Sequence, residues 1–268
     1  MRRRWPILVL AVTLFAGGTL PAAASGGVAS AGPAVQPGGP VRHLFLPHPE
    51  GSTSAVPSTN WSGYVATGSA FSSVASDWVQ PAGQCGSGAS VAKYAAFWVG
   101  LDGDNNNTVE QTGSEVDCVG GTAHYYAWYE MYPDTAVNFG ETIKAGDQLA
   151  GSVTYEGSNQ FQLTLADSTQ GWSQTVTQTT AAATRSSAEI IGEAPCCTAG
   201  GAPLPLTDFG SVSFASATVN GSAFCDASPF EIVMPDVTVS PLSGCGAFTV
   251  TYSDTSASGT SGSGTSAN

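Results

Sequence analysis

Two short segments far apart in the chain carry polar residues where a strand would ordinarily be apolar. They are Val109–Gly113 and Ala188–Glu193. Side chains alternate between the faces of an antiparallel strand, so Glu189 and Glu193 share one face, and the amide of Gln111 can be brought onto the same surface. A carboxylate can take a proton from an attacking water, and an amide N–H can stabilise the oxyanion that forms. The two segments can therefore bring an amide and a carboxylate together, and the rest of the chain decides whether they form a functional pair.

Most other hydrolytic and cofactor chemistries have no support in the sequence. Once the N-terminal segments described below are set aside, His124 is the only histidine, and no GxSxG motif accompanies it. HExxH, Walker A and GxGxxG motifs are missing too, so we expect no metal and no cofactor. The paired D-[TS]-G segments of aspartic peptidases are also absent.

Carboxylate chemistry also permits a different reaction. Glu130 and Glu193 could act as the two acids that flank a glycosidic bond. A non-catalytic β-sandwich that binds carbohydrate is a third reading. It would leave Gln111 and Glu193 without a shared role.

The segment from Ala123 to Tyr132 is rich in aromatic residues. Period-two alternation places Tyr126, Trp128, Glu130 and Tyr132 on one face. An aromatic face with one embedded carboxylate is typical of a binding surface. The alternative is that these aromatic side chains fill a sandwich core, with Glu130 as a satisfied buried acid.

The N-terminus has the features of a secretory signal peptide. Arginines at positions 2–4 precede the apolar stretch 6–16, and an A-x-A cleavage site ends at Ala24. We therefore expect residues 1–24 to be removed and the protein to be secreted, without a membrane anchor. Residues 25–58 are rich in Gly, Pro, Ala and Ser, which predicts a pro-segment or disordered leader.

The mature chain would be strongly acidic. Cleavage after Ala24 removes three of the seven Lys+Arg residues and leaves 4 basic against 20 acidic residues, a formal charge of −16. Nucleic acid and anionic membranes are therefore not expected as partners. So few cations also leave little self-repulsion once acid has neutralised the carboxylates, which predicts an acid-tolerant fold.

Six cysteines in an exported protein favour disulfides over metal ligation. They are Cys85, Cys118, Cys196, Cys197, Cys225 and Cys245. The neighbours Cys196 and Cys197 are expected to pair with different partners, because a bond between adjacent residues needs unusual backbone geometry.

The rest of the chain predicts one all-β domain over residues 59–252. Short segments rich in Val, Tyr, Phe, Trp and Thr recur at intervals of roughly 8–12 residues, as in an antiparallel β-sandwich of two packed, curved sheets. The expected strands lie at 61–66, 75–79, 91–99, 108–112, 123–132, 148–155, 160–166, 172–177, 188–193, 210–219, 230–237 and 248–252. Little or no helix is expected, and residues 253–268 should form a flexible tail.

Several stretches resemble the glutamic peptidases, also called eqolisins or peptidase family G1. They occur in the family's order and span roughly residues 60–250. The stretches are Asn60-Trp61-Ser62-Gly63-Tyr64, Phe97 to Gly103, Glu110-Gln111-Thr112-Gly113, Tyr126 to Pro133, Ala188 to Glu193, and Asp208-Phe209-Gly210.

The resemblance implies a fold, a reaction and a site. The fold would be a sandwich of two seven-stranded antiparallel sheets, and the reaction would be cleavage of polypeptides at low pH by a monomeric enzyme without a cofactor. The catalytic dyad would be Gln111 and Glu193, with Glu189 outside it. The resemblance gives supporting roles to Trp61, Trp98, Asp102, Trp128 and Glu130. We expect the dyad residues to meet across the sandwich and to share one water.

Overall fold

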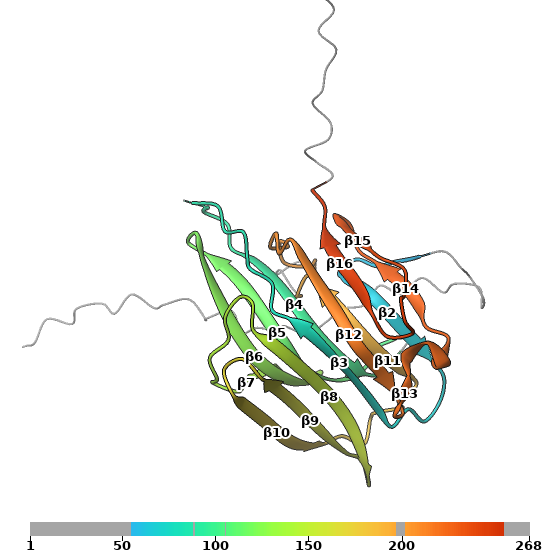
Figure 1. Cartoon of the computed structure of the whole chain (residues 1–268). Helices are drawn as coiled ribbons and strands as arrows, with labels where there is room; N and C mark the ends of the chain where they lie inside the picture. Colours follow the sequence, from blue (N-terminus) through green and yellow to red (C-terminus); the bar gives the residue numbers. More distant parts are fainter. Residues whose placement is uncertain (1–54, 88, 105, 197–201, 255–268) are drawn as a thin grey trace, which may run out of the picture. The chain divides into compact units, whose positions relative to one another are not determined.

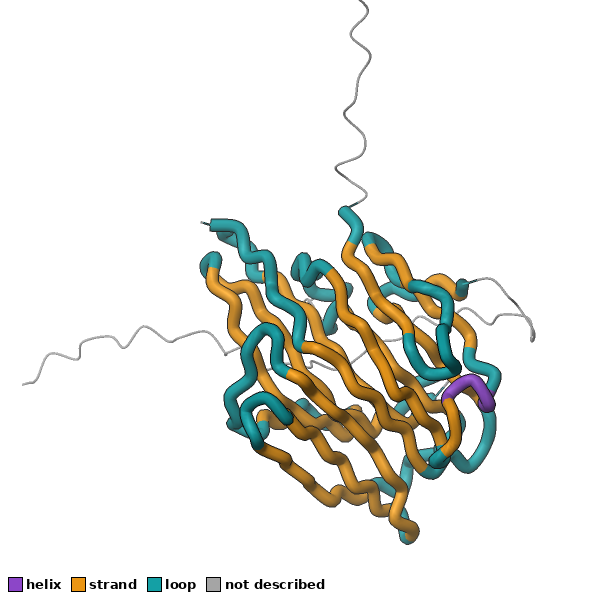
Figure 2. The backbone as a smooth tube through the Cα atoms, in the orientation of Figure 1, coloured by secondary structure: helices purple, strands orange, loops and turns teal. Residues whose placement is uncertain are grey.

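The computed structural model describes residues 55–254, apart from 88, 105 and 197–201. The predicted signal peptide, most of the leader and most of the C-terminal tail lie outside these residues. Strands dominate Figure 2, together with one short 3-10 helix, η1 (Phe224–Ala227), within the described part of the chain. No helix in this part is long and apolar enough to cross a membrane.

The structure is the expected β-sandwich of two sheets with mainly antiparallel pairing. In the described residues the first sheet has eight strands in the order β1-β14-β2-β11-β4-β5-β6-β7. Their bounds are β1 (Val56–Pro57), β2 (Trp61–Thr67), β4 (Lys93–Leu101), β5 (Val109–Val119), β6 (Thr122–Tyr132), β7 (Val137–Asn138), β11 (Ser187–Glu193) and β14 (Phe230–Val233).

The second sheet also has eight strands within the described residues. Seven follow the order β10-β9-β8-β3-β12-β16-β15, and β13 pairs with β12 beside them. Their bounds are β3 (Ser73–Val79), β8 (Gln148–Gly157), β9 (Gln160–Asp167), β10 (Trp172–Thr179), β12 (Ser211–Val219), β13 (Ser222–Ala223), β15 (Val237–Val239) and β16 (Phe248–Tyr252). Each sheet thus has more than the seven strands that the resemblance implies. The count includes the two-residue strands β1 and β7 in the first sheet and β13 in the second.

Three strand predictions need correction. β5 continues to Val119, seven residues beyond the predicted end, because its polar side chains are buried by their neighbours instead of marking a loop. The strand predicted at 230–237 is two strands in different sheets, β14 and β15, since Pro235 lacks a backbone N–H for a ladder. The short β1 lies within the predicted leader and pairs in parallel with β14.

Alternation along the strands divides the first sheet into two faces. One face packs against the second sheet and forms the main core; for example, Phe97, Val99 and Leu101 of β4 share a cluster with Val153 of β8 and Leu163 of β9. Figure 1 shows the two layers, with β3, β8 and β12 stacked over the first sheet. The opposite face of the first sheet, here called the site face, carries its own smaller apolar cluster. Burial on both faces explains why β4, β5 and β11 contain hardly any exposed residue.

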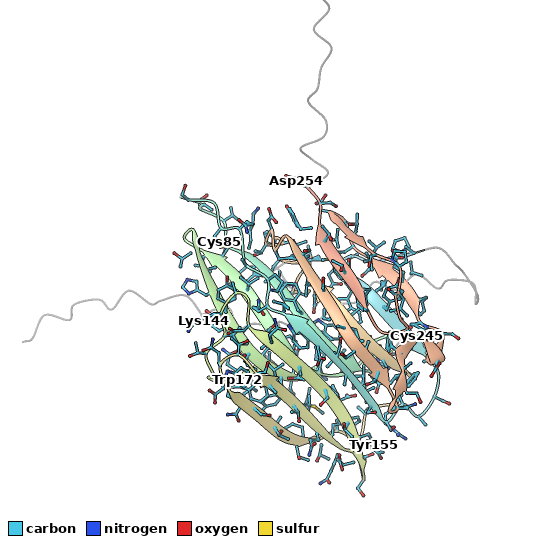
Figure 3. The ribbon with its side chains drawn as sticks, in the orientation of Figure 1. Cys85, Lys144, Tyr155, Trp172, Cys245 and Asp254 are labelled. Atoms are coloured by element: carbon cyan, nitrogen blue, oxygen red, sulfur yellow. A yellow bond between two sulfur atoms is a disulfide. The ribbon has the colours of Figure 1, made fainter. Side chains whose placement is uncertain are left out.

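Two disulfides are described, Cys85–Cys118, which joins a loop to β5, and Cys225–Cys245, which joins η1 to a turn. Figure 3 labels one cysteine of each, and the two lie on different sides of the drawn molecule. Cys196 is also disulfide-bonded. The other four cysteines pair among themselves, so none of them is the partner of Cys196. The expectation for Cys197 falls outside the described residues.

Candidate active site

The predicted catalytic residues lie on the site face, in three cross-strand rows over β11, β4, β5 and β6. The first row is Glu189, Gly100, Gln111 and Glu130; the second is Ile191, Trp98, Gly113 and Trp128; the third is Glu193, Ala96, Glu115 and Tyr126. Each row combines large side chains with one small residue on β4 or β5. This alternation gives the polar side chains room to converge above the sheet.

Close neighbours require glycine at two of these positions. A Cβ atom on Gly113 would lie 2.3 Å from the backbone oxygen of Phe97 and 2.5 Å from Cβ of Trp98, and one on Gly100 would lie 2.9 Å from Cζ3 of Trp98. These distances are far below ordinary contacts. Gly113 therefore lets β5 lie close to β4, and Gly100 leaves room for the Trp98 ring.

The carboxylate of Glu193 is buried and held by hydrogen-bond donors. Trp98 Nε1 donates to its Oε2 at 2.7 Å, and Asn60 Nδ2 donates to its Oε1 at 3.1 Å. Burial raises the pKa of Glu193 to about 8, and hydrogen bonds from Trp98, Trp61 and Asn60 oppose that rise by favouring the ionised form. The site is thus built to hold this carboxyl group in either protonation state.

Gln111 is oriented by Glu130. Its Nε2 donates to Glu130 Oε2 at 2.7 Å, which fixes the direction of the amide. Burial raises the pKa of Glu130 well above its ordinary value, the charge of Glu193 raises it further, and the hydrogen bond from Gln111 lowers it. Glu130 therefore lies within electrostatic reach of Glu193 while it binds Gln111, and it links the two predicted catalytic residues.

The expectation that the dyad residues meet across the sandwich is wrong. Gln111 on β5 and Glu193 on β11 belong to the same sheet, with β4 between them. They stand in the first and third rows, and the Trp98 row separates them. The reason is topological: β11 inserts between β2 and β4, so both residues project from one face of one sheet.

Asp102 has a different role from that of a group beside the dyad. Its carboxylate accepts hydrogen bonds from the backbone N–H groups of Thr184, Arg185 and Ser186, at 2.7–2.9 Å. The side chain of Asn106 also donates to it, at 2.6 Å. Asp102 thereby anchors the segment that leads into β11 and sets where that strand begins.

The predicted tryptophans form the apolar part of the site face. Trp61 packs edge-on against Trp98, with ring centroids 4.7 Å apart. Trp128 belongs to the same cluster, and Thr112 on the opposite face of β5 donates to its backbone carbonyl. The alternation predicted for residues 123–132 is confirmed, because Tyr125, Ala127, Tyr129 and Met131 pack against the main core and Trp128 does not.

Two site residues are missing from the sequence-based prediction. Asn60, which donates a hydrogen bond to Glu193, precedes Trp61 in the first stretch that resembles the family. Its place in that stretch is the sequence feature that could have identified it as a site residue. Glu115 shares a row with Glu193, but the predicted strand ended at Thr112, so alternation was never extended to it.

Removing the Trp98 donor should slow catalysis in acid. In Trp98→Phe the ionised form of Glu193 loses a hydrogen bond, so its pKa should rise further. The ionised fraction of Glu193 at pH 3, and with it kcat/KM, should then fall by roughly tenfold, the size expected for one charge-assisted hydrogen bond. Initial rates on a soluble peptide substrate at pH 3 measure this, and a kcat/KM equal to that of the wild type would contradict the assignment of Trp98.

Comparison with known proteins places these residues in context. The model of the Peptidase A4 family matches residues 59–233. The chain is 32% identical over 230 residues to aspergillopepsin-2 of Aspergillus niger, covering 75% of this chain and 80% of that protein.

Two solved structures resemble the fold. Scytalido-glutamic peptidase with a peptide-based transition state analog superposes with a TM-score of 0.61 at 27% identity, covering 72% of this chain and 98% of that one. Aspergilloglutamic peptidase from Aspergillus niger gives a TM-score of 0.51 at 33% identity, covering 60% and 99%.

Proposed function

Because the chain belongs to the Peptidase A4 family, the glutamic peptidases, and is therefore a peptide-bond hydrolase, we propose that it is a secreted acid endopeptidase with Gln111 and Glu193 as its catalytic dyad. One observation carries the proposal. A buried carboxylate with side-chain donors on both oxygens shares one face of a sheet with an amide that Glu130 orients.

Glu193 would serve as base and then as acid. Its carboxylate, the minor form in acid because burial raises the pKa, takes a proton from the water that attacks the peptide carbonyl. It then donates this proton to the departing amine. The donors Trp98, Trp61 and Asn60 stabilise the ionised form for the first step, and burial favours the protonated form for the second. No covalent intermediate is needed.

Gln111 would stabilise the oxyanion. Its Nε2 carries two hydrogens, and the bond to Glu130 uses one of them. The other can point at the developing negative charge. An amide does not titrate, so it offers this donor at any pH, and the bond to Glu130 fixes the donor in advance of the reaction.

Polypeptides are the proposed substrates. Scytalido-glutamic peptidase, a member of the same family, was solved with a peptide-based transition state analog. Family membership favours this reading over glycoside hydrolysis and over non-catalytic carbohydrate binding. Export is supported by the signal-like N-terminus and by the two disulfides, which persist in oxidising compartments.

The test is hydrolysis of an unfolded protein at pH 3 and at pH 7, beside release of reducing sugar from a polysaccharide. We expect peptide fragments at pH 3, little cleavage at pH 7 and no sugar release. Chelators and serine or cysteine reagents should have no effect, since the proposed mechanism uses no metal and no covalent nucleophile. Sugar release without peptide cleavage would overturn the proposal.

A further inference from the structure

A second pair of buried carboxyl groups lies beside Glu193. Glu115 and Asp117 project from β5 onto the site face and are only 1% and 2% exposed. Glu115 stands in the same cross-strand row as Glu193, with only Ala96 between them. The methyl group of Ala96 cannot screen two carboxyl groups that extend above it, so their charges interact.

Glu115 and Asp117 are hydrogen-bonded to each other. Two carboxylates repel, so this bond exists only while the pair retains a proton. Within the described residues, Oε2 of Glu115 and Oδ1 of Asp117 are buried and accept no hydrogen bond. The pair therefore has little else to stabilise a second negative charge.

The groups that face this pair are mostly acidic or neutral. Glu193 on β11 and Glu130 on β6 interact with Glu115, and the phenols of Tyr94 on β4 and Tyr126 on β6 lie within reach of both acids. The one cation found close to the pair in the described residues is His124, which is opposite Asp117 and exposed to solvent. Solvent screens His124, so it compensates a buried charge only in part.

We propose that the Glu115–Asp117 pair sets the upper pH limit of catalysis, as a positioning device that acts on Glu193 through charge. While both acids are protonated, the negative charge of the tetrahedral intermediate develops in a nearly neutral surrounding. Once Asp117 ionises, its negative charge disfavours the intermediate. The inference rests on the proposed function of Gln111 and Glu193.

The direction of the pKa shifts agrees with this geometry. Burial raises the pKa of Glu115 well above its ordinary value, and the charge and hydrogen bond of Asp117 raise it further. Burial raises the pKa of Asp117 to about 6, against the opposing effects of Glu115 and His124. Both acids are therefore protonated at low pH, and Asp117 ionises first, as the pH rises through about 6, while Glu115 keeps its proton and donates it to Asp117.

The experiment compares kcat/KM between pH 2.5 and 8 for the wild type, Glu115→Gln and Asp117→Asn. Both substitutions imitate the protonated acid and keep a donor for the hydrogen bond, so the fold should be preserved in acid. The matched control is Asp77→Asn, which removes one exposed carboxylate from the second sheet. We expect the upper limb of Asp117→Asn, which lacks the first negative charge of the pair, to move upward by about one pH unit, the scale of a nearby charge. The limbs of Glu115→Gln, in which Asp117 still ionises, and of the control should not move upward.

Unfolding at higher pH must be separated from this effect. Initial rates are therefore taken directly after a pH jump, and the activity recovered on return to pH 4 shows that the enzyme remained folded. An unmoved upper limb in Asp117→Asn with full activity at pH 4 overturns the inference, as does an equal shift in Asp77→Asn. Asp117→Asn alone decides these outcomes, so they do not depend on whether Glu115→Gln folds. The proposed function would stand in each case, because Glu193→Gln and the substrate assay test it separately.

Discussion

Glu193→Gln should reduce kcat/KM on an unfolded protein at low pH by at least about 10³-fold, within the range that general acid–base catalysis contributes. Glutamine has nearly the shape of the protonated acid and can still accept the Trp98 hydrogen bond that now holds Oε2. It cannot take a proton from water or return one to the amine. The loss should therefore appear in kcat, with the fold unchanged.

Glu189→Gln is the matched control for this prediction. Glu189 lies four residues away on the same strand and the same face, and it is just as buried. Burial raises the pKa of its carboxyl group well above the ordinary value, and a hydrogen bond with Ser187 lowers it. The charges of Asp104, Asp102 and Glu110 raise it further. Its carboxyl group thus belongs to the Asp102 end of the sheet. Activity within about tenfold of the wild type is expected; a reversed pattern, with Glu189 essential and Glu193 dispensable, would sink the dyad assignment.

The folded protein should be most stable in acid and should lose stability as the pH rises from about 4.5 toward 9. Over this interval the buried acids have released their protons in the unfolded state but still hold them in the folded state. Burial raises the pKa of Glu193 to about 8 and that of Glu110 to about 9, and it also raises those of Glu115, Glu130 and Glu189. At pH values below the pKa that these groups have in the unfolded state, they are protonated in both states and do not change the free energy of unfolding. Above that pKa the folded state must hold protons that the unfolded state has released, so the free energy of unfolding falls.

The expected effect is large, because each pKa unit corresponds to about 1.4 kcal/mol. A single group such as Glu110 then costs on the order of a few kcal/mol at pH 8. Thermal unfolding measured from pH 3 to pH 9 should show a Tm that declines across this interval. Glu110→Gln should flatten the decline and leave the Tm at pH 3 nearly unchanged. A Tm that rises from pH 4 to pH 8 would contradict the prediction.

The sequence alone determined much of what depends on local chemistry. Alternation in residues 123–132 separated the core-facing residues from Trp128 and Glu130, and the structure has the same division. The missing nucleophile motifs left carboxylate chemistry, and the match of several ordered stretches gave the family. These signals are readable because side-chain direction in a strand repeats every two residues, whatever the strand pairs with.

Only the tertiary structure decided which strands lie together. Glu193 and Glu115 are far apart in the chain, and they share a row solely because β11 and β5 both pair with β4 in one register. Gln111 and Glu193 project from one sheet instead of facing each other across two, and Asp102 serves the start of β11. Register and sheet order come from pairing between distant segments, and alternation within one strand contains no information about them.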